Sequence, residues 1–283
     1  MRVVHIDCGR EMRGGQWQVL RLIEGLSALG VESALLAPKG SPLAARARAL
    51  CEVRAPHLLN VARRYDIVHA HDARAHTLAA LAARGPLIVA RRVAFPPRSR
   101  WKYGRATRYI AVSEFVKRVL VRSGVPEDKI SVVYDGVPLL PPTEGGTLVV
   151  APAYRDDPQK GLALAGVPVH YSADLEADLP RAAMFVYLTH SEGLGSGALL
   201  AMSAGVPVVA SRTGGLPEIV RHMETGLLVD NTAESAAAAI ALLRADPDLA
   251  RRLGAAARRA VQASFSTEAM VRRTLEVYRQ VLS

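Results

Sequence analysis

Cysteine, acidic residues and long apolar runs are all scarce in this chain of 283 residues. Its two cysteines, Cys8 and Cys51, lie in apolar stretches with no metal-ligand spacing around them. This argues against a disulfide framework and favours two reduced thiols, because disulfide-rich chains are typically small and secreted. The first residues lack the apolar core of a secretory signal, and no run approaches the roughly 20 apolar residues of a membrane span. We therefore expect a cytoplasmic protein that at most lies on the inner face of the cell membrane.

Basic residues outnumber acidic ones, 36 to 26, so the formal net charge is +10. A charge of this size suits anionic partners such as phosphorylated substrates, a membrane surface or nucleic acid, without choosing among them. Half of the residues are hydrophobic, and the chain is longer than one compact core usually needs. Two α/β domains of ordinary size fit these numbers.

Short apolar runs rich in β-branched residues alternate with helical patterns along the chain. In the first half the predicted strands are residues 3–6, 32–37, 66–71, 86–90, 108–113 and 130–135. Paired prolines and glycines at 137–146 interrupt the pattern and predict a linker, after which the alternation resumes. Near-continuous apolar strands separated by helices predict parallel sheets covered on both faces. We therefore predict two domains, residues 1–140 and 141–283, with terminal helices that can pack back on the first domain.

The segment 190–218, HSEGLGSGALLAMSAGVPVVASRTGGLPE, is the most specific motif of the chain. A predicted strand ends near Glu192, Gly193 and Gly195 follow, and a helix begins there. Free backbone N–H groups and the helix dipole converge at such a point, which predicts an anion site. An isolated EGLG would equally fit a glycine-rich turn with an exposed glutamate, so the continuation of the motif decides between the two interpretations.

That continuation resembles the family 4 retaining glycosyltransferases (glycosyl transferases group 1), whose pattern reads E-G-x-G, L-E-A-M, G-x-P-V-V-A-S and G-G-x-P-E. The matching positions are Glu192, Gly193, Gly195, Leu199, Ala201, Met202, Gly205, Pro207, Val208, Val209, Ala210, Ser211, Gly214, Gly215, Pro217 and Glu218. The resemblance implies the GT-B fold, in which two Rossmann-like α/β/α domains face a central cleft. It also implies a nucleoside-diphosphate sugar donor, with no metal and no other cofactor.

By the same resemblance, Glu192 would hold hydroxyl groups of the donor sugar. Residues 193–195 and Leu199 would line the donor site, with backbone amides beyond Gly193 and Gly195 meeting the sugar and the diphosphate. One position departs from the pattern: the second glutamate of the family, which grips the ribose, falls on Leu200. Losing charge-assisted hydrogen bonds costs about 1.5–3 kcal/mol each, so the ribose must be held otherwise, be bound weakly or not be bound.

Two further loops match the family. YRDDPQKGL at 154–162 keeps the arginine-to-lysine spacing of G-R-x-x-x-x-K-G, so that Arg155 and Lys160 would bind the departing diphosphate. Gly14 and Gly15, just before the first helix, resemble the G-G loop that faces the donor diphosphate. They do not form the dinucleotide fingerprint G-x-G-x-x-G, which disfavours a nicotinamide or flavin cofactor.

Histidines cluster in HAHDARAH, with His69, His71 and His76 around a predicted strand end. Alternate histidines could bind zinc, but further ligands at suitable spacing are lacking, and the family places H-x-H here without metal. We expect His71 to be an acceptor-side contact. Asp246-Pro-Asp248 matches a metal-binding D-x-D, but its place at a helix start favours capping, so no metal site is predicted.

Residues 91–108 carry seven basic and no acidic side chains, interleaved with aromatic ones. They form either a solvated loop or a surface for a phosphorylated acceptor or anionic lipid, through which we expect peripheral membrane contact. Family members often have a histidine near this position that lies beside the transferred sugar. This chain has Arg92 there instead, and we assign Arg92 to the acceptor side. Asp135 similarly replaces the asparagine of a family N-G-V.

The hypothesis that follows is a metal-independent glycosyltransferase acting with retention of configuration. Its acceptor would be a cell-envelope glycan or lipid-linked saccharide, as in polysaccharide or lipopolysaccharide biosynthesis. The second domain is shortened after Lys160, which with Leu200 leaves an alternative open: a degenerate, non-catalytic GT-B protein that binds a sugar or a partner enzyme. The interpretation as a nucleic-acid-binding protein has only the net charge to support it and no recognised binding motif. We therefore expect no nucleic-acid partner.

Overall fold

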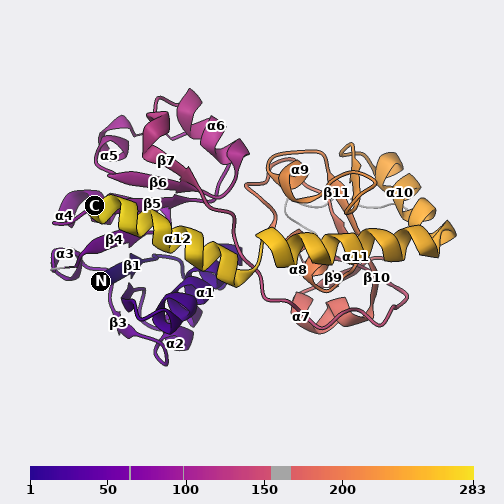
Figure 1. Ribbon diagram of the computed structural model, residues 1–283, viewed down its shortest axis with the longest axis horizontal. Helices are drawn as coiled ribbons and strands as arrows, with labels where there is room; N and C mark the ends of the chain where they lie inside the picture. The colour runs from indigo at the N-terminus through magenta and orange to yellow at the C-terminus, as the bar shows by residue number, and fades with distance from the viewer. Residues whose placement is uncertain (64, 98, 154–166) are drawn as a thin grey trace. The chain divides into compact units, whose positions relative to one another are not determined.

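Parallel strands form the sheet of the first half of the chain (Figure 1). The computed structural model describes residues 1–63, 65–97, 99–153 and 167–283. Within them, the first sheet has the strand order β3-β2-β1-β4-β5-β6-β7. Its strands are β1 (Arg2–Ile6), β2 (Glu32–Leu36), β3 (Glu52–Arg54), β4 (Ile67–Ala70), β5 (Leu87–Arg91), β6 (Arg108–Ala111) and β7 (Ile130–Val132). Because all pairs are parallel, the carboxyl ends of these strands lie at one edge of the sheet.

Helices cover this sheet, as the near-continuous apolar strands predict. They are α1 (Gly14–Ala28), α2 (Pro42–Ala47), α3 (Leu58–Val61), α4 (Ala73–Ala82), α5 (Arg100–Gly104), α6 (Glu114–Arg122), the 3₁₀ turn η1 (Glu127–Lys129) and α12 (Thr267–Leu282). The last helix is remote in sequence but belongs to this core, where Val271 and Tyr278 are buried with Val3 and Ile67. It packs so closely on α1 that a Cβ added to Gly25 would lie 2.5 Å from Val271 Cγ2.

The second sheet is also parallel, with the order β12-β11-β10-β8-β9 in the described residues. Its strands are β8 (Leu148–Pro152), β9 (His170–Ser172), β10 (Ala182–Tyr187), β11 (Val208–Ser211) and β12 (Leu227–Val229). The helices are α7 (Leu175–Asp178), η2 (Leu179–Arg181), α8 (Ser196–Ser203), α9 (Leu216–Ile219), α10 (Ala233–Ala245) and α11 (Pro247–Ser264). A separate hydrophobic core joins the sheet to α10 and α11 through Val186, Val209, Ile240 and Leu253.

The chain thus divides into two compact units, each with its own parallel sheet. The first comprises Met1–Gly136 and Thr267–Ser283, and the second Val137–Ser266. The passage between them falls directly before the proline- and glycine-rich stretch at 137–146. The first and last residues of the second unit lie close together, since Val137 N donates a hydrogen bond of 3.0 Å to Phe265 O. The predicted fold class, two parallel α/β domains, is confirmed.

Helix starts follow capping rules that can be read from the sequence. Asp72 accepts from Arg74 N and Ala75 N at the start of α4. Asp246 accepts from Leu249 N at 2.9 Å at the start of α11, where Pro247 occupies the first turn. The predicted capping role of the D-x-D segment is therefore what its first aspartate performs. No helix in the described ranges is long and apolar enough to cross a bilayer.

Candidate functional site

The carboxylate of Glu192 lies in the loop between β10 and α8 and is held at both oxygens. Tyr187, the last residue of β10, donates its hydroxyl to Glu192 Oε2 at 2.6 Å. The backbone N–H of Gly193 donates to Oε1 at 2.9 Å. Hydrogen bonds to an ionised oxygen are short and strong, so these two contacts give the carboxylate a defined direction.

The glycine pair of the loop after β11 holds the backbone of the same segment. Gly214 has φ +60°, and a Cβ added there would lie 2.0 Å from Glu192 O. A Cβ on Gly215 would lie 2.2 Å from Gly193 O, and Gly215 N donates to Glu192 O at 3.2 Å. Only glycine permits so close an approach of two backbones. The G-G of the sequence motif is therefore a packing requirement of the glutamate loop.

Helix α8 begins directly after this loop, with Gly195 as its N-cap in the left-handed region at φ +106°. A Cβ there would meet Leu216 Cδ2 at 2.6 Å, which again requires glycine. The first turn carries no acidic residue, and its N-cap contributes no side-chain hydrogen bond. Backbone N–H groups at such a helix start are suited to an anion such as a diphosphate.

A polar chain stabilises the loop on its other side. Thr189 N donates to Ser211 Oγ at 2.9 Å, and Ser211 Oγ donates to Asn231 Oδ1 at 2.8 Å. Asn231 Nδ2 in turn lies 2.9 Å from His190 Nδ1. These side chains come from the carboxyl ends of β10, β11 and β12, where parallel α/β sheets bind ligands. Sequence reasoning missed His190, Asn231 and Tyr187; their signal is that each polar group directly follows or ends an apolar strand.

The leucines of the predicted donor site are buried in the second unit. The side chains of Leu194 and Leu199 are buried, so what they can offer a ligand is backbone. Leu200 is 8% exposed on α8 and presents no acceptor at the position of the family's second glutamate. Arg155 and Lys160 lie outside the described residues.

In the first unit, Gly14 and Gly15 begin α1 as predicted from the sequence. Asp7, directly after β1, holds the preceding loop by accepting from Gly9 N at 2.9 Å and from Gln16 Nε2 at 3.1 Å. Burial raises the pKa of Asp7 above its usual value. The Arg92 side chain reaches this helix start, since its Cδ is 4.0 Å from where a Cβ of Gly15 would stand.

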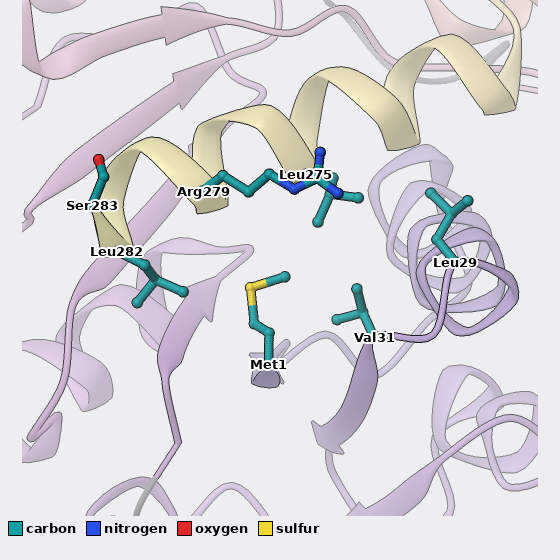
Figure 2. A pocket seen from close by; sticks show the side chains of 7 residues that line it. All are labelled: Met1, Leu29, Val31, Leu275, Arg279, Leu282 and Ser283. Carbon is teal, nitrogen blue, oxygen red and sulfur yellow. The ribbon is translucent and has the colours of Figure 1, made fainter.

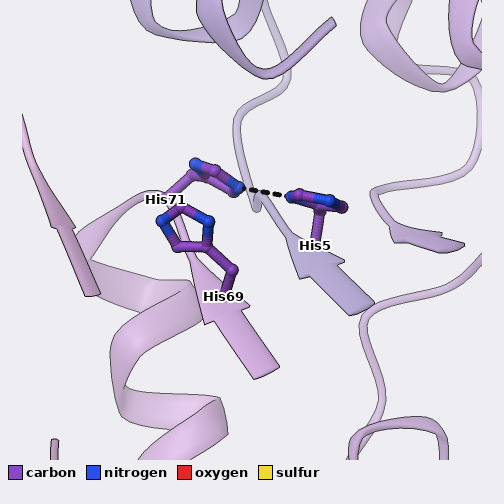
Figure 3. Close-up of side chains that lie close together, drawn as sticks. All are labelled: His5, His69 and His71. Carbon is purple, nitrogen blue, oxygen red and sulfur yellow. Dashed lines mark hydrogen bonds between the residues drawn. The ribbon is translucent and has the colours of Figure 1, made fainter. Parts of the chain in front are cut away.

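Three buried imidazoles meet at the carboxyl ends of β1 and β4 (Figure 3). His5 Nδ1 and His71 Nε2 are 3.0 Å apart, and His69 Nδ1 is 2.6 Å from the hydroxyl of Tyr278 on α12. His5 pairs directly with His69 in the parallel register, so both point to the sheet face that α12 covers. His76, the remaining histidine of HAHDARAH, lies on α4 with its Nε2 3.0 Å from Lys102 O and is not part of this cluster.

Arg92 determines how the protons of this histidine cluster are arranged. Its Nη1 lies 3.4 Å from His71 Nδ1 and its Nε lies 3.1 Å from Asp135 Oδ1. A guanidinium can only donate, so His71 accepts at Nδ1 and carries its proton on Nε2, which donates to His5. Burial, with the charge of Arg92, lowers the pKa of His5 to about 3 and that of His69 and His71 well below the usual value. The cluster is therefore neutral at physiological pH.

The spacing of His5, His69 and His71 is also that of a metal site, since one nitrogen of each lies within 4.8 Å of the others. These imidazoles instead make hydrogen bonds, between His5 Nδ1 and His71 Nε2 and between His69 Nδ1 and the Tyr278 hydroxyl. The Arg92 guanidinium beside His71 would also repel a second cation in a buried, poorly screened place.

Basic and aromatic side chains alternate in the described part of 91–108, as predicted. Arg91 lies over the Tyr103 ring at 6.0 Å and Arg105 over Trp101 at 5.7 Å. Phe95 and Trp101 are about half exposed. The segment therefore presents exposed aromatic rings together with guanidinium groups.

An apolar hollow of about 440 Å³ opens elsewhere on the first unit (Figure 2). Met1, Leu29, Val31, Leu275, Arg279, Leu282 and Ser283 line it. These residues surround the amino ends of β1 and β2 and the end of α12, so the hollow lies at the opposite sheet edge from the histidine cluster. It plays no part in the candidate site.

Comparison with known proteins gives a consistent result for both units. Residues 12–139 match the family model described as Glycosyltransferase Family 4, and residues 169–260 match Glycosyl transferases group 1. N-acetyl-alpha-D-glucosaminyl L-malate synthase of Bacillus anthracis is 38% identical over 101 residues, which are 35% of this chain and 26% of that protein. Alpha-maltose-1-phosphate synthase of Mycolicibacterium smegmatis is 38% identical over 122 residues, 41% of this chain and 31% of that protein.

These alignments span less than a third of the length of the curated relatives. Similarity in structure extends over the whole chain. Anabaena Alr3699/HepE, solved in complex with UDP and glucose, has a TM-score of 0.84 at 17% identity, covering 99% of this chain and 100% of that one. The chain belongs to the glycosyltransferases, with a family 4 domain followed by a group 1 domain in the GT-B fold.

Proposed function

We propose that this protein transfers a sugar from a nucleoside-diphosphate sugar to an acceptor with retention of configuration, and that it needs no metal ion. The observation that carries the proposal is the Glu192 carboxylate, held by Tyr187 and Gly193 at the start of α8. A fixed carboxylate can accept hydroxyl groups of a sugar, while the adjacent helix start offers N–H groups to a diphosphate. The Anabaena neighbour, solved with UDP and glucose, supports a donor of this class.

In this reaction the bond from the anomeric carbon to the diphosphate oxygen breaks. The oxygen of an acceptor hydroxyl bonds to the same face of the sugar, and its proton passes to the departing diphosphate oxygen. Arg155 and Lys160 would stabilise the negative charge that develops on the leaving diphosphate, which is the main task of a site for such a transfer. Gly14, Gly15 and residues 193–195 would contribute backbone N–H groups on the donor side.

On the acceptor side the two proposed residues have different roles. His71 is only 6% exposed, and its nitrogens face His5 and Arg92. Contact with the acceptor would therefore come from Arg92, and His71 would hold it in place. A cell-envelope glycan or lipid-linked saccharide is the acceptor class we propose. Peripheral contact of 91–108 with an anionic membrane would bring a lipid-linked acceptor near, because exposed rings and basic groups favour that interface.

A thermal-shift screen against UDP, GDP, ADP and dTDP and their sugar conjugates, with magnesium or with EDTA, tests the donor site. Saturation at about 100 times Kd stabilises by roughly 2.7 kcal/mol, a shift of several degrees. We expect one base to be selected, equally well in EDTA. With that donor, Lys160→Ala and Glu192→Gln should lose turnover while keeping the fold. Unchanged turnover in both would contradict the assignment, and no shift with any nucleotide would favour the non-catalytic alternative, for which Leu200 is the specific observation.

A further inference from the structure

The ring of Tyr187 is fixed more firmly than hydrogen bonding alone requires. Tyr187 is 6% exposed and its ring stacks on Phe185 with centroids 6.0 Å apart. On α8, a Cβ added to Gly197 would lie 3.3 Å from Tyr187 Cε2, so the helix backbone passes close to the ring. Within this packing the hydroxyl donates to Glu192 Oε2 at 2.6 Å.

The opposite side of the Glu192 carboxylate is fixed by the main chain. Gly193 N donates to Oε1 at 2.9 Å, and the Glu192 carbonyl is held by Gly215 N at 3.2 Å. Because a hydrogen bond is donated to each oxygen, the plane of the carboxylate is restrained. The directions in which it accepts further hydroxyl groups are then restrained as well, because a carboxylate oxygen accepts along its lone pairs.

We infer that Tyr187 is a positioning residue that directs Glu192 toward the donor sugar and thereby sets which epimer of the sugar the site prefers. The inference rests on the proposed function. Epimers differ in the direction of one hydroxyl group. A carboxylate with a fixed plane accepts a well-aligned hydrogen bond from the hydroxyl group of one epimer and a poorly aligned one from the other. A carboxylate that can rotate accepts well from both.

Tyr187→Phe tests this, since it removes one oxygen and keeps the packed ring. Calorimetry would compare two series of ligands. The first is UDP with UDP-glucose and UDP-galactose, whose sugars are epimers at C4. The second is GDP with GDP-glucose and GDP-mannose, whose sugars are epimers at C2. In the base series that the wild type binds, Kd for the bare nucleotide should change less than twofold. Kd for the preferred sugar nucleotide should rise by about tenfold, the order expected for one charge-assisted hydrogen bond, and the preference between epimers should shrink accordingly.

A double-mutant cycle shows whether Tyr187 acts through Glu192. On a Glu192→Ala background, Tyr187→Phe should have no further effect on sugar-nucleotide affinity. Glu192→Asp keeps the charge but draws it away from the phenol, and should reduce the preference between epimers without altering the tyrosine packing. Tyr65→Phe is the matched control, because the Tyr65 hydroxyl is buried in the first unit with no hydrogen-bond partner in the described residues.

Three results would overturn the inference: an unchanged epimer preference in Tyr187→Phe, equal weakening of bare nucleotide and sugar nucleotide, or an effect that persists with Glu192→Ala. Each leaves the proposed donor site standing, since the wild type still binds. A wild type that binds no nucleotide would overturn the proposed function and the role of Tyr187 together.

Discussion

Arg92 and Asp135 form an ion pair, with Nε and Oδ1 3.1 Å apart and side chains only 17% and 12% exposed. Arg92 follows β5 and Asp135 follows β7, so the pair joins two loops at the carboxyl edge of the first sheet. In the sequence these positions are two separate departures from the family pattern. The structure shows that they are partners, because the carboxylate of Asp135 compensates the charge of Arg92.

Asp135→Asn should destabilise the protein by about 1–3 kcal/mol, because it leaves Arg92 largely buried without its counter-charge. Arg92→His together with Asp135→Asn should cost less than the sum of the single changes, with a coupling of about 0.5–3 kcal/mol. Urea denaturation of the four proteins measures this. Glu224→Gln, which breaks the exposed pair with Arg221, is the control and should leave the midpoint unchanged. Simple additivity would show that Arg92 and Asp135 are independent.

The histidine cluster and the separate, buried His76 should make the protein sensitive to acid. Burial lowers the pKa of His5 to about 3 and of His76 to about 4, and the pKa values of His69 and His71 lie well below normal. Below about pH 6.5 the unfolded chain takes up these protons and the folded chain does not, so stability falls as pH falls. Asp7 acts in the opposite direction at lower pH, because its raised pKa lets the folded state bind a proton first.

Urea denaturation at pH 7, 6 and 5 measures this dependence, at about 1.4 kcal/mol per pH unit for each proton taken up. His71→Gln should reduce the slope by about one proton. Equal stability at pH 7 and pH 5 would mean that the cluster already accommodates protons when folded.

Gly214→Ala should disrupt the glutamate loop. The added Cβ would lie 2.0 Å from Glu192 O, in addition to the strain at φ +60°. Gly40→Ala is the matched control, since its φ is +80° but nothing lies within 4 Å of the new Cβ. The control should lose about 1 kcal/mol from strain alone. Gly214→Ala should lose clearly more, together with sugar-nucleotide affinity; equal melting temperatures would show that the loop relaxes without cost.

Local patterns in the sequence predict the two sheets, the helix caps and the glycine pair, because each depends on neighbours within a few residues. The last helix, α12, shows the limit of such local prediction. Its apolar face does not determine which of the two cores it joins, because Val271 contacts Gly25 only in the folded chain. His5 was missed for the same reason. A lone histidine in a strand gains its partners His69 and His71 from strand register, which is not written in local periodicity.

Leu200 provides the sharpest test of how the nucleotide is held. It is 8% exposed on α8, so a glutamate there could bring its longer side chain to the surface with little repacking. Leu200→Glu should tighten binding of the selected nucleoside diphosphate by about tenfold or more, since each restored charge-assisted bond contributes about 1.5–3 kcal/mol. Calorimetry with the matching 2′,3′-dideoxynucleotide shows whether the gain comes from the ribose, because that ligand lacks both hydroxyl groups and should gain nothing. Leu200→Met controls for the change in shape. An equal gain for both ligands would place the new carboxylate away from the ribose, and no gain for either would mean that other groups already hold it.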